Sequence, residues 1–240
     1  ALPTPSLALT CAAREALRIG DFVEQMLAAL GRLMQDNHRS SADEIRRLDD
    51  VVDSLYKQVK FYLTQVSRTP MGERESRKWT DIISFTINLE QVGDIIEKSA
   101  NDVVSKNIER NRNFSDAGRQ ELCDLHARLV ANLRLAMNVF INNDVNDAEK
   151  LLAEKVKFRE LELVNYDKHL VRLADHTVQS IETSSLHLDL MRDLKRINSH
   201  FCSVAYPILE AAGALSESRL RAVEHERGDV TITGGGRQRV

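Results

Sequence analysis

The sequence predicts an all-α protein in which six long antiparallel helices form two tandem three-helix bundles. Proline is confined to positions 3, 5, 70 and 207, so no proline interrupts residues 71–206. That stretch is also poor in glycine and in the apolar–polar alternation of strands, whereas its apolar residues recur at helical spacing. The chain has 240 residues, of which 42% are hydrophobic, and this is sufficient for a substantial core.

Capping signals and turns divide the chain into its expected helices. Ser41 and Glu44 form a capping-box pattern that predicts the start of the second helix, and Asn146 and Glu149 predict the start of the fifth. Pro207 is expected to kink the last helix or to shift its start. The expected helices cover residues 8–36, 42–67, 73–110, 117–143, 146–174 and 182–215.

The two halves of the chain are similar to each other at a shift of 105 residues. This shift places the segment LEQVGDIIEKSA (89–100) on LKRINSHFCSVA (194–205) in the same helical register. A repeat of this length, with three helices in each copy, predicts two related bundles. We therefore expect a first repeat with an N-terminal lead-in at 1–110, a second repeat at 111–215 and a flexible tail at 216–240.

Composition excludes several classes of protein. The charged residues nearly balance at a net charge of −3, so nothing indicates a basic surface for nucleic acid. Cys11, Cys123 and Cys202 are far apart, which argues against both a disulfide framework and a thiolate zinc site. No apolar run approaches the roughly 20 residues that cross a bilayer, and no secretion signal is evident. These features predict a soluble chain in a reducing, cytoplasmic setting.

Two acidic pairs occur on neighbouring helices, each pair separated by one helical turn. Asp49 and Asp53 lie beside the apolar stripe of the second expected helix, and Glu90 and Asp94 lie beside that of the third. If these carboxylates converge, they repel one another and favour a cation. Hard oxygen ligands suit Mg, Mn, Ca or Fe, and zinc also accepts carboxylates. Acidic pairs of this spacing also occur on solvated helix faces that bind nothing, so both alternatives stay open.

The second repeat lacks most of this acidic pattern. If the first repeat has a cation site, we therefore expect the second repeat to lack an equivalent one. Lys195 is expected to supply a fixed positive charge there instead. In the first repeat, Gly93 lies between the second pair of acids and permits a close approach to the backbone. The residues of the second repeat at the positions of Asp49, Asp53, Glu90 and Asp94 are Glu154, Phe158, Lys195 and Ser199.

The motifs of both repeats resemble those of PhoU, the phosphate-uptake regulator. PhoU bundles carry D-x-x-x-D on the second helix and E-x-x-x-D within a segment like ERIGDH on the third. DDVVD and EQVGD match the first-repeat motifs, with Gln91 in the usual place of arginine, whereas KRINSH keeps Arg196, Ile197 and His200 but neither acid. Residues 180–209 are more specifically similar to the PhoU-like cytoplasmic tail of bacterial sodium/phosphate cotransporters of the type II-related family.

This resemblance covers residues 8–215 and implies a regulatory or accessory domain of a sodium-dependent phosphate transporter. Its implied partner is its own transmembrane transport domain or another phosphate transporter, at the cytoplasmic face of the inner or plasma membrane, and a homo-oligomer is also expected. A free-standing PhoU-type regulator of phosphate uptake is the alternative. PhoU proteins of this architecture are associated with metal clusters on the acidic motifs, which implies Mg, Mn, Zn or Fe as the cofactor. The implied ligands are Asp49, Asp53, Glu90 and Asp94.

No pattern indicates a catalytic site, and we expect a non-enzymatic protein. None of the seven histidines follows an acid by three residues, so the E-x-x-H signature of di-iron bundles is absent. The sequence also lacks a glycine-rich phosphate cradle and a G-x-S-x-G elbow. Two alternatives from other classes are a metal-dependent hydrolase that uses the acids to activate water and an inert helical scaffold.

Overall fold

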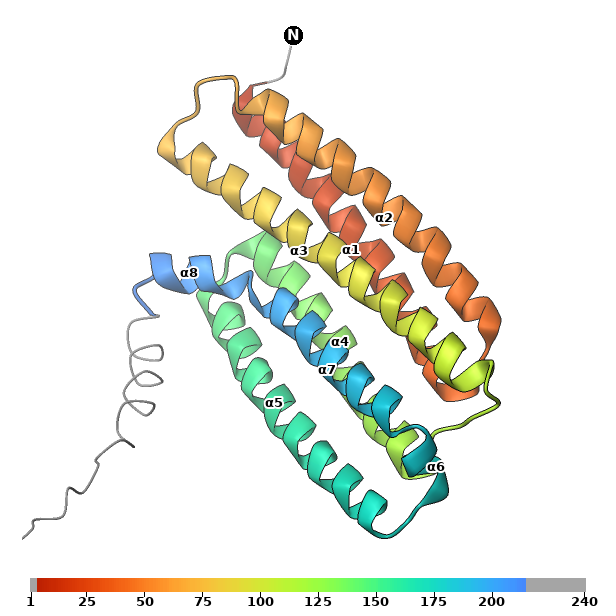
Figure 1. The fold of residues 1–240 in the computed structure, drawn as a ribbon. Coiled ribbons are helices and arrows are strands. Elements are labelled where there is room, and N and C mark those ends of the chain that lie inside the picture. The colour runs from red at the N-terminus through yellow and green to blue at the C-terminus, as the bar shows by residue number, and fades with distance from the viewer. Residues whose placement is uncertain (1–3, 215–240) are drawn as a thin grey trace, which may run out of the picture.

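The computed structural model describes residues 4–214, and within this range it contains helices and turns but no strand. The predicted all-α fold is confirmed, and two bundles of long helices lie side by side (Figure 1). The predicted tail at 216–240 lies outside the described residues.

The first bundle contains α1 (Pro5–Asp36), α2 (Arg39–Val66) and α3 (Glu73–Val103). A π-helical turn, η1 (Val104–Ile108), follows α3 directly. Each helix turns one apolar stripe toward the other two, which is why three amphipathic helices form a common core. On α2 the buried apolar stripe includes Ile45, Val52, Leu55, Val59 and Leu63.

The second bundle contains α4 (Asp116–Asn142), α5 (Val145–Ala174) and α7 (Ser184–Cys202). Two short helices flank α7, namely α6 (Val178–Glu182) and α8 (Ala205–Ala211). The single helix expected at 182–215 is therefore interrupted, as Pro207 predicts. Pro207 lies in the first turn of α8, where a backbone N–H has no partner within the helix, so the proline costs little there.

The predicted capping boxes are wrong in register. Helix α2 begins at Arg39, ahead of Ser41, and the Glu44 carboxylate lies 2.7 Å from the Arg32 guanidinium of α1 instead of capping its own helix. Helix α5 begins at Val145, because the side chain of Asp144 accepts a hydrogen bond from the backbone N–H of Asp147 at 2.9 Å. An acid outside the assumed box therefore caps α5, whereas the start of α2 has no side-chain cap.

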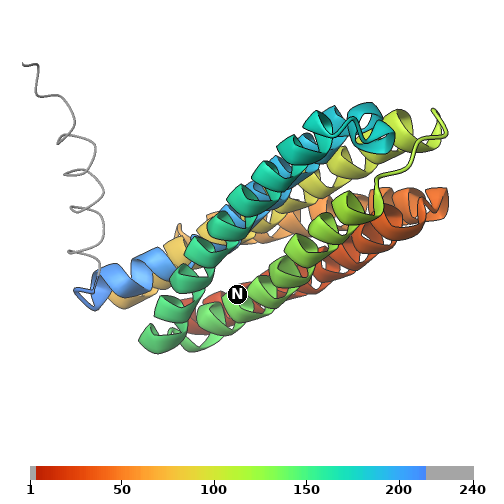
Figure 2. The same cartoon turned by 90° about the horizontal axis from the view of Figure 1, so that it is seen from below.

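The bundles pack through two pairs of helices, α1 with α4 and α3 with α7 (Figures 1 and 2). Between α1 and α4, a Cβ atom at Gly31 would lie 2.7 Å from Cε1 of His126, so only glycine permits this approach. Between α3 and α7, Nζ of Lys98 lies 2.7 Å from the buried carboxylate of Asp193. Close backbone packing and a partly buried ion pair thus join the two repeats.

Candidate metal centre

The acidic pairs of the first repeat lie where α2 packs against α3. Val52 of α2 is buried in the bundle core. Asp53 reaches from α2 toward α3, and Oδ1 of Asp49 lies close to Gly93 of α3. Glu90 and Asp94 lie one turn apart on the neighbouring flank of α3. The helical register that buries the apolar stripes therefore brings the acids of the two helices together.

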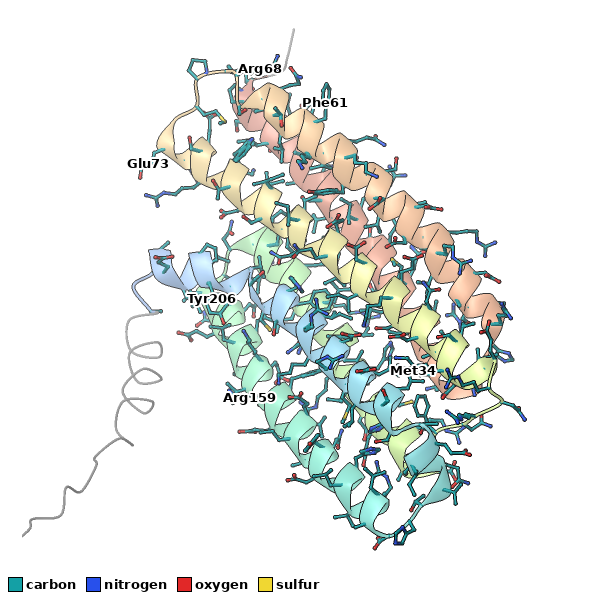
Figure 3. All side chains as sticks on the ribbon, viewed as in Figure 1. Met34, Phe61, Arg68, Glu73, Arg159 and Tyr206 are labelled. Atoms are coloured by element: carbon teal, nitrogen blue, oxygen red, sulfur yellow. The ribbon has the colours of Figure 1, made fainter. Side chains whose placement is uncertain are left out.

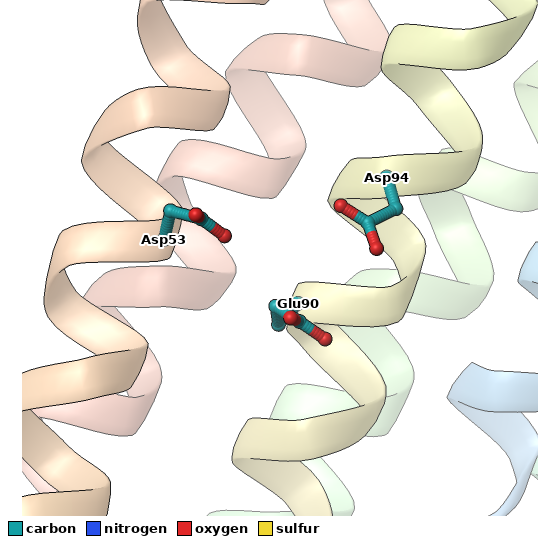
Figure 4. Close-up of side chains that lie close together, drawn as sticks. All are labelled: Asp53, Glu90 and Asp94. Carbon is teal, nitrogen blue, oxygen red and sulfur yellow. The ribbon is translucent and has the colours of Figure 1, made fainter.

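Three of the four acids form a compact group (Figure 4). Asp53, Glu90 and Asp94 each contribute a carboxylate oxygen, and these three oxygens lie within 4.8 Å of one another. Figure 4 shows Asp53 reaching from α2 toward the two acids of α3. Asp49, the fourth predicted ligand, is not part of this group and lies beside it.

Gly93 explains how Asp49 approaches α3. A Cβ atom at Gly93 would lie 2.9 Å from Oδ1 of Asp49 and 3.5 Å from a methyl carbon of Val52. The carboxylate of Asp49 therefore rests over the α3 backbone at a point that any side chain would fill. The close approach that the sequence predicts for this glycine is present, and the approaching group is a carboxylate.

Burial and mutual repulsion raise the pKa values of these acids. Burial and then the charges of neighbouring carboxylates, that of Glu97 foremost, raise the pKa of Asp49 from 3.8 to about 7. Burial, followed by the charges of Asp94 and Asp53, raises the pKa of Glu90. Burial and the charge of Asp53 also raise the pKa of Asp94. The site therefore concentrates negative charge that a cation would stabilise.

Nearby basic residues compensate this charge only in part. Nζ of Lys57 lies 2.8 Å from Oδ2 of Asp53, and Nε of Arg46 lies 3.9 Å from Oε1 of Glu97. Both basic side chains are largely exposed, so their contribution is weak. An all-carboxylate donor set suits hard divalent cations or iron and accommodates zinc, so the residues fit the group that the resemblance implies.

The second repeat replaces the acidic group with an internal ion pair. Lys195, at the position of Glu90, lies 3.1 and 2.9 Å from the two carboxylate oxygens of Glu162. Glu162 in turn occupies the position of Lys57, so acid and base have exchanged helices between the repeats. Phe158, at the position of Asp53, is buried in the core. Within residues 4–214 the acids of the first repeat are the one group of three that gathers this closely.

The second bundle contains a buried polar cluster that the sequence pattern did not predict. Glu121 of α4 forms two hydrogen bonds of 2.7 Å with the Arg172 guanidinium of α5. The buried ring of His187 lies 3.4 Å from Glu121 and stacks on His169. Burial opposes ionisation of Glu121, but the hydrogen bonds from His187 and Arg172 lower its pKa to about 2. The sequence feature that could have indicated this cluster is the position of Glu121 on the apolar stripe of α4, one turn before Leu125.

Both bundles match the model of the PhoU domain, over residues 16–103 and 122–208. The chain belongs to the PhoU domain family. PhoU from Pseudomonas aeruginosa superposes with a TM-score of 0.78 at 16% identity, covering 85% of this chain and 96% of that one. PhoU from Streptococcus pneumoniae gives a TM-score of 0.75 at 14% identity, covering 85% and 95%. These identities are low, so the superpositions support the shared fold alone.

Curated relatives of this PhoU-family chain have much higher identity. It is 46% identical over 210 residues to the "Putative inorganic phosphate export protein YjbB" of Escherichia coli K12 and of Salmonella typhimurium. The match covers 88% of this chain but 38% of each relative, so most of their length has no counterpart here. In residues 4–214, no helix has both the length and the apolarity needed to cross a bilayer.

The comparisons confirm the resemblance to PhoU. They do not support the narrower resemblance to the tail of sodium/phosphate cotransporters, because the YjbB proteins are named for phosphate export and the solved structures are PhoU proteins.

Proposed function

We propose that this chain is a PhoU-type regulator of phosphate movement across a membrane and that it acts on a phosphate transporter. The observation that carries the proposal is the 46% identity, over 210 residues, to proteins named for inorganic phosphate export. The match spans 88% of this chain, so both bundles contribute to it. Regulation by a helical module requires no catalytic group, which agrees with the non-enzymatic character expected from the sequence.

The comparisons favour the PhoU-type regulator over a domain of a sodium-dependent transporter. The relatives that share 46% identity with this chain are named for phosphate export and not for sodium transport. The names of the YjbB proteins also favour export over the uptake expected from the sequence. We place the chain at the cytoplasmic face of the membrane, in contact with its transport partner.

We propose further that Asp53, Glu90 and Asp94 hold Mg, Mn, Zn or Fe, with Asp49 at the edge of the site. A bound cation would supply positive charge to a group of acids whose pKa values burial and repulsion raise. The protein's own contribution is to hold the carboxylates of α2 and α3 together against their repulsion. Metal analysis of protein purified without chelator, compared with Glu90→Gln/Asp94→Asn, tests this site. Equal metal content in both proteins would refute it.

The regulatory function is tested by phosphate flux in the native host. Four strains are compared: one with the natural chain, one with its coding region deleted, one with Glu90→Gln/Asp94→Asn and one with Asp50→Asn. Each strain is loaded with radiolabelled phosphate, and its release and uptake of phosphate are measured. We expect deletion to change the release rate severalfold, and Asp50→Asn, a substitution of an exposed acid outside the group of three, to have no effect. Equal fluxes in the deletion and natural strains, at both low and high external phosphate, would refute the proposal. An effect that disappears when sodium is replaced by potassium would restore the sodium-dependent alternative.

The hydrolase alternative is tested on the purified protein. We expect no turnover of p-nitrophenyl phosphate above the buffer rate in the presence of Mg, Mn or Zn. Metal-dependent turnover that Asp94→Ala abolishes would overturn the non-enzymatic assignment, because the acids would then be activating water.

A further inference from the structure

A cavity of about 280 Å³ lies between the two repeats, near the point where α8 turns away from the line of α7 (Figure 1). Helix α3 of the first repeat forms one wall, the end of α4 forms a second, and the segment from Ser203 into α8 forms a third. A volume of this size is at the small end of the range for ligand sites, so it suits a small molecule.

Aromatic rings form the apolar part of this cavity. Phe85 of α3 stacks on Phe140 of α4, with ring centroids 4.1 Å apart and an interplanar angle of 14°. Tyr206 lies at the start of α8 (Figure 3), and its hydroxyl accepts a hydrogen bond of 3.0 Å from Nζ of Lys155. These rings come from both repeats, so an apolar ligand in the cavity would contact both of them.

The charged residues that line the cavity are acids. Asp81 of α3 and Glu210 of α8 are part of its wall, and within residues 4–214 neither carboxylate forms an ion pair or a hydrogen bond. Burial raises the pKa of the Asp81 carboxyl. Lys155 and His200 each bond a lining side chain but do not line the cavity themselves. Such a lining disfavours phosphate or any other anion and favours a cation.

The contact between α3 and α7 shows how the repeat fills the corresponding space farther along the two helices. Nζ of Lys98 lies 2.7 Å from Oδ2 of Asp193, and Nζ of Lys106 lies 3.1 Å from Oδ2 of Asp189. Two lysine side chains of α3 therefore occupy this part of the contact and neutralise the acids of α7.

The cavity is the counterpart of this ion-paired contact. At the shift of 105 residues, Ser84 and Asn88 take the positions of the two acids, and Ser203 and Ala211 take the positions of the two lysines. Of these four residues, the three that have polar side chains line the cavity. The space is therefore open where two long basic side chains are replaced by short ones, and Asp81 leaves a negative charge beside it.

We propose that this cavity binds a small organic ammonium ion, with the charged amine beside Asp81 and the apolar body of the ligand against Phe85 and Phe140. The amine takes the part that the lysine ammonium groups have in the counterpart contact, and the aromatic rings shield the rest of the ligand from water. Asp81 and Phe85 lie one turn apart on α3, so one small molecule can contact both. The site is distinct from the acids shared by α2 and α3 and does not depend on the proposed regulatory function.

Isothermal titration calorimetry of the full chain at pH 8 tests this site with phenethylamine, which is protonated at that pH as a lysine amine is. We expect a Kd of about 1 mM or tighter. Phenethyl alcohol, which has the same ring but a neutral hydroxyl, should bind at least tenfold more weakly. Asp81→Asn should weaken binding of the amine at least tenfold, whereas Asp50→Asn, at an exposed acid of α2, is the matched control and leaves it unchanged. Absence of amine binding, equal binding of amine and alcohol, or no effect of Asp81→Asn would refute the proposal.

A second variant fills the cavity from within the chain. Ser203→Lys installs the lysine that the first repeat has at this position, and we expect it to abolish binding of phenethylamine because its own ammonium group takes the same place. Ser54→Lys, which adds the same charge at an exposed position of α2, is the matched control and should bind the amine as the natural chain does. Circular dichroism of each variant separates loss of binding from loss of folding. Undiminished amine binding by folded Ser203→Lys protein would contradict the placement of the ligand.

Discussion

The raised pKa of Asp49 predicts a pH-dependent loss of stability that one substitution should remove. The pKa is about 7 in the folded chain and near 3.8 when the chain is unfolded, so between these values the folded state binds more protons. Stability contributed by this group is therefore complete below about pH 4 and is lost as the pH rises toward 7. A rise of this size corresponds to about 4 kcal/mol. Because Asp49 is partly exposed, solvent screening reduces this to about 2 kcal/mol.

Asp49→Asn removes the titrating group, so the metal-free variant should be more stable than the natural chain by about 2 kcal/mol at pH 8, with a smaller difference at pH 5. Urea unfolding with a chelator at pH 5, 6, 7 and 8 measures this difference. Asp50→Asn, at the exposed neighbouring position, is the matched control and should be close to neutral at every pH. A stability difference between Asp49→Asn and the natural chain that is the same at pH 5 and pH 8 would contradict the account of the buried, repelled carboxylate.

Three further substitutions test other parts of the structure. Arg172→Ala leaves the Glu121 carboxylate buried without its arginine partner and should lower the free energy of unfolding by about 3–5 kcal/mol, measured in urea; a loss below about 1 kcal/mol would contradict the buried ion pair. Phe158→Ala creates a cavity and should cost about 3–5 kcal/mol by the same measurement, and a near-neutral effect would place this ring outside the core. Gly93→Ala directs a Cβ atom at Asp49 and should lower the metal bound per chain, measured by elemental analysis; unchanged metal content would show that Asp49 is dispensable.

Helical periodicity was sufficient to predict the fold but not the ends of its helices. The apolar stripes are repeated many times along each helix, so a single misleading residue does not alter the class. A helix start depends on one or two hydrogen bonds, and Glu44 was misassigned because its partner, Arg32, belongs to a different helix. The break before Pro207 was predictable because proline acts through local geometry.

The candidate site was partly predictable for the same reason. Asp53, Glu90 and Asp94 converge because each has a fixed angle to the apolar stripe of its own helix, and this angle can be counted from the sequence. Helical angles do not predict that Glu121 pairs with Arg172. The two residues lie on different helices, and each has other basic or acidic neighbours. The exposure of the apolar residues of α5 was also not predictable, because periodicity alone does not say which of two apolar stripes faces the core.

The exchange of charge between the repeats means that a cation bound by the acids would affect the contact between α2 and α3 but not its counterpart in the second bundle, where Lys195 supplies the charge. The positive charge of Lys195 is part of the chain, so it is present beside Glu162 at every concentration of free cations. The acids of the first repeat, by contrast, would be neutralised only when protons or cations are abundant. A change in ionic conditions would then act on the contact between α2 and α3 and leave its counterpart in the second bundle as it was. The second bundle would then keep one arrangement of its helices, and only the first bundle would change with ionic conditions.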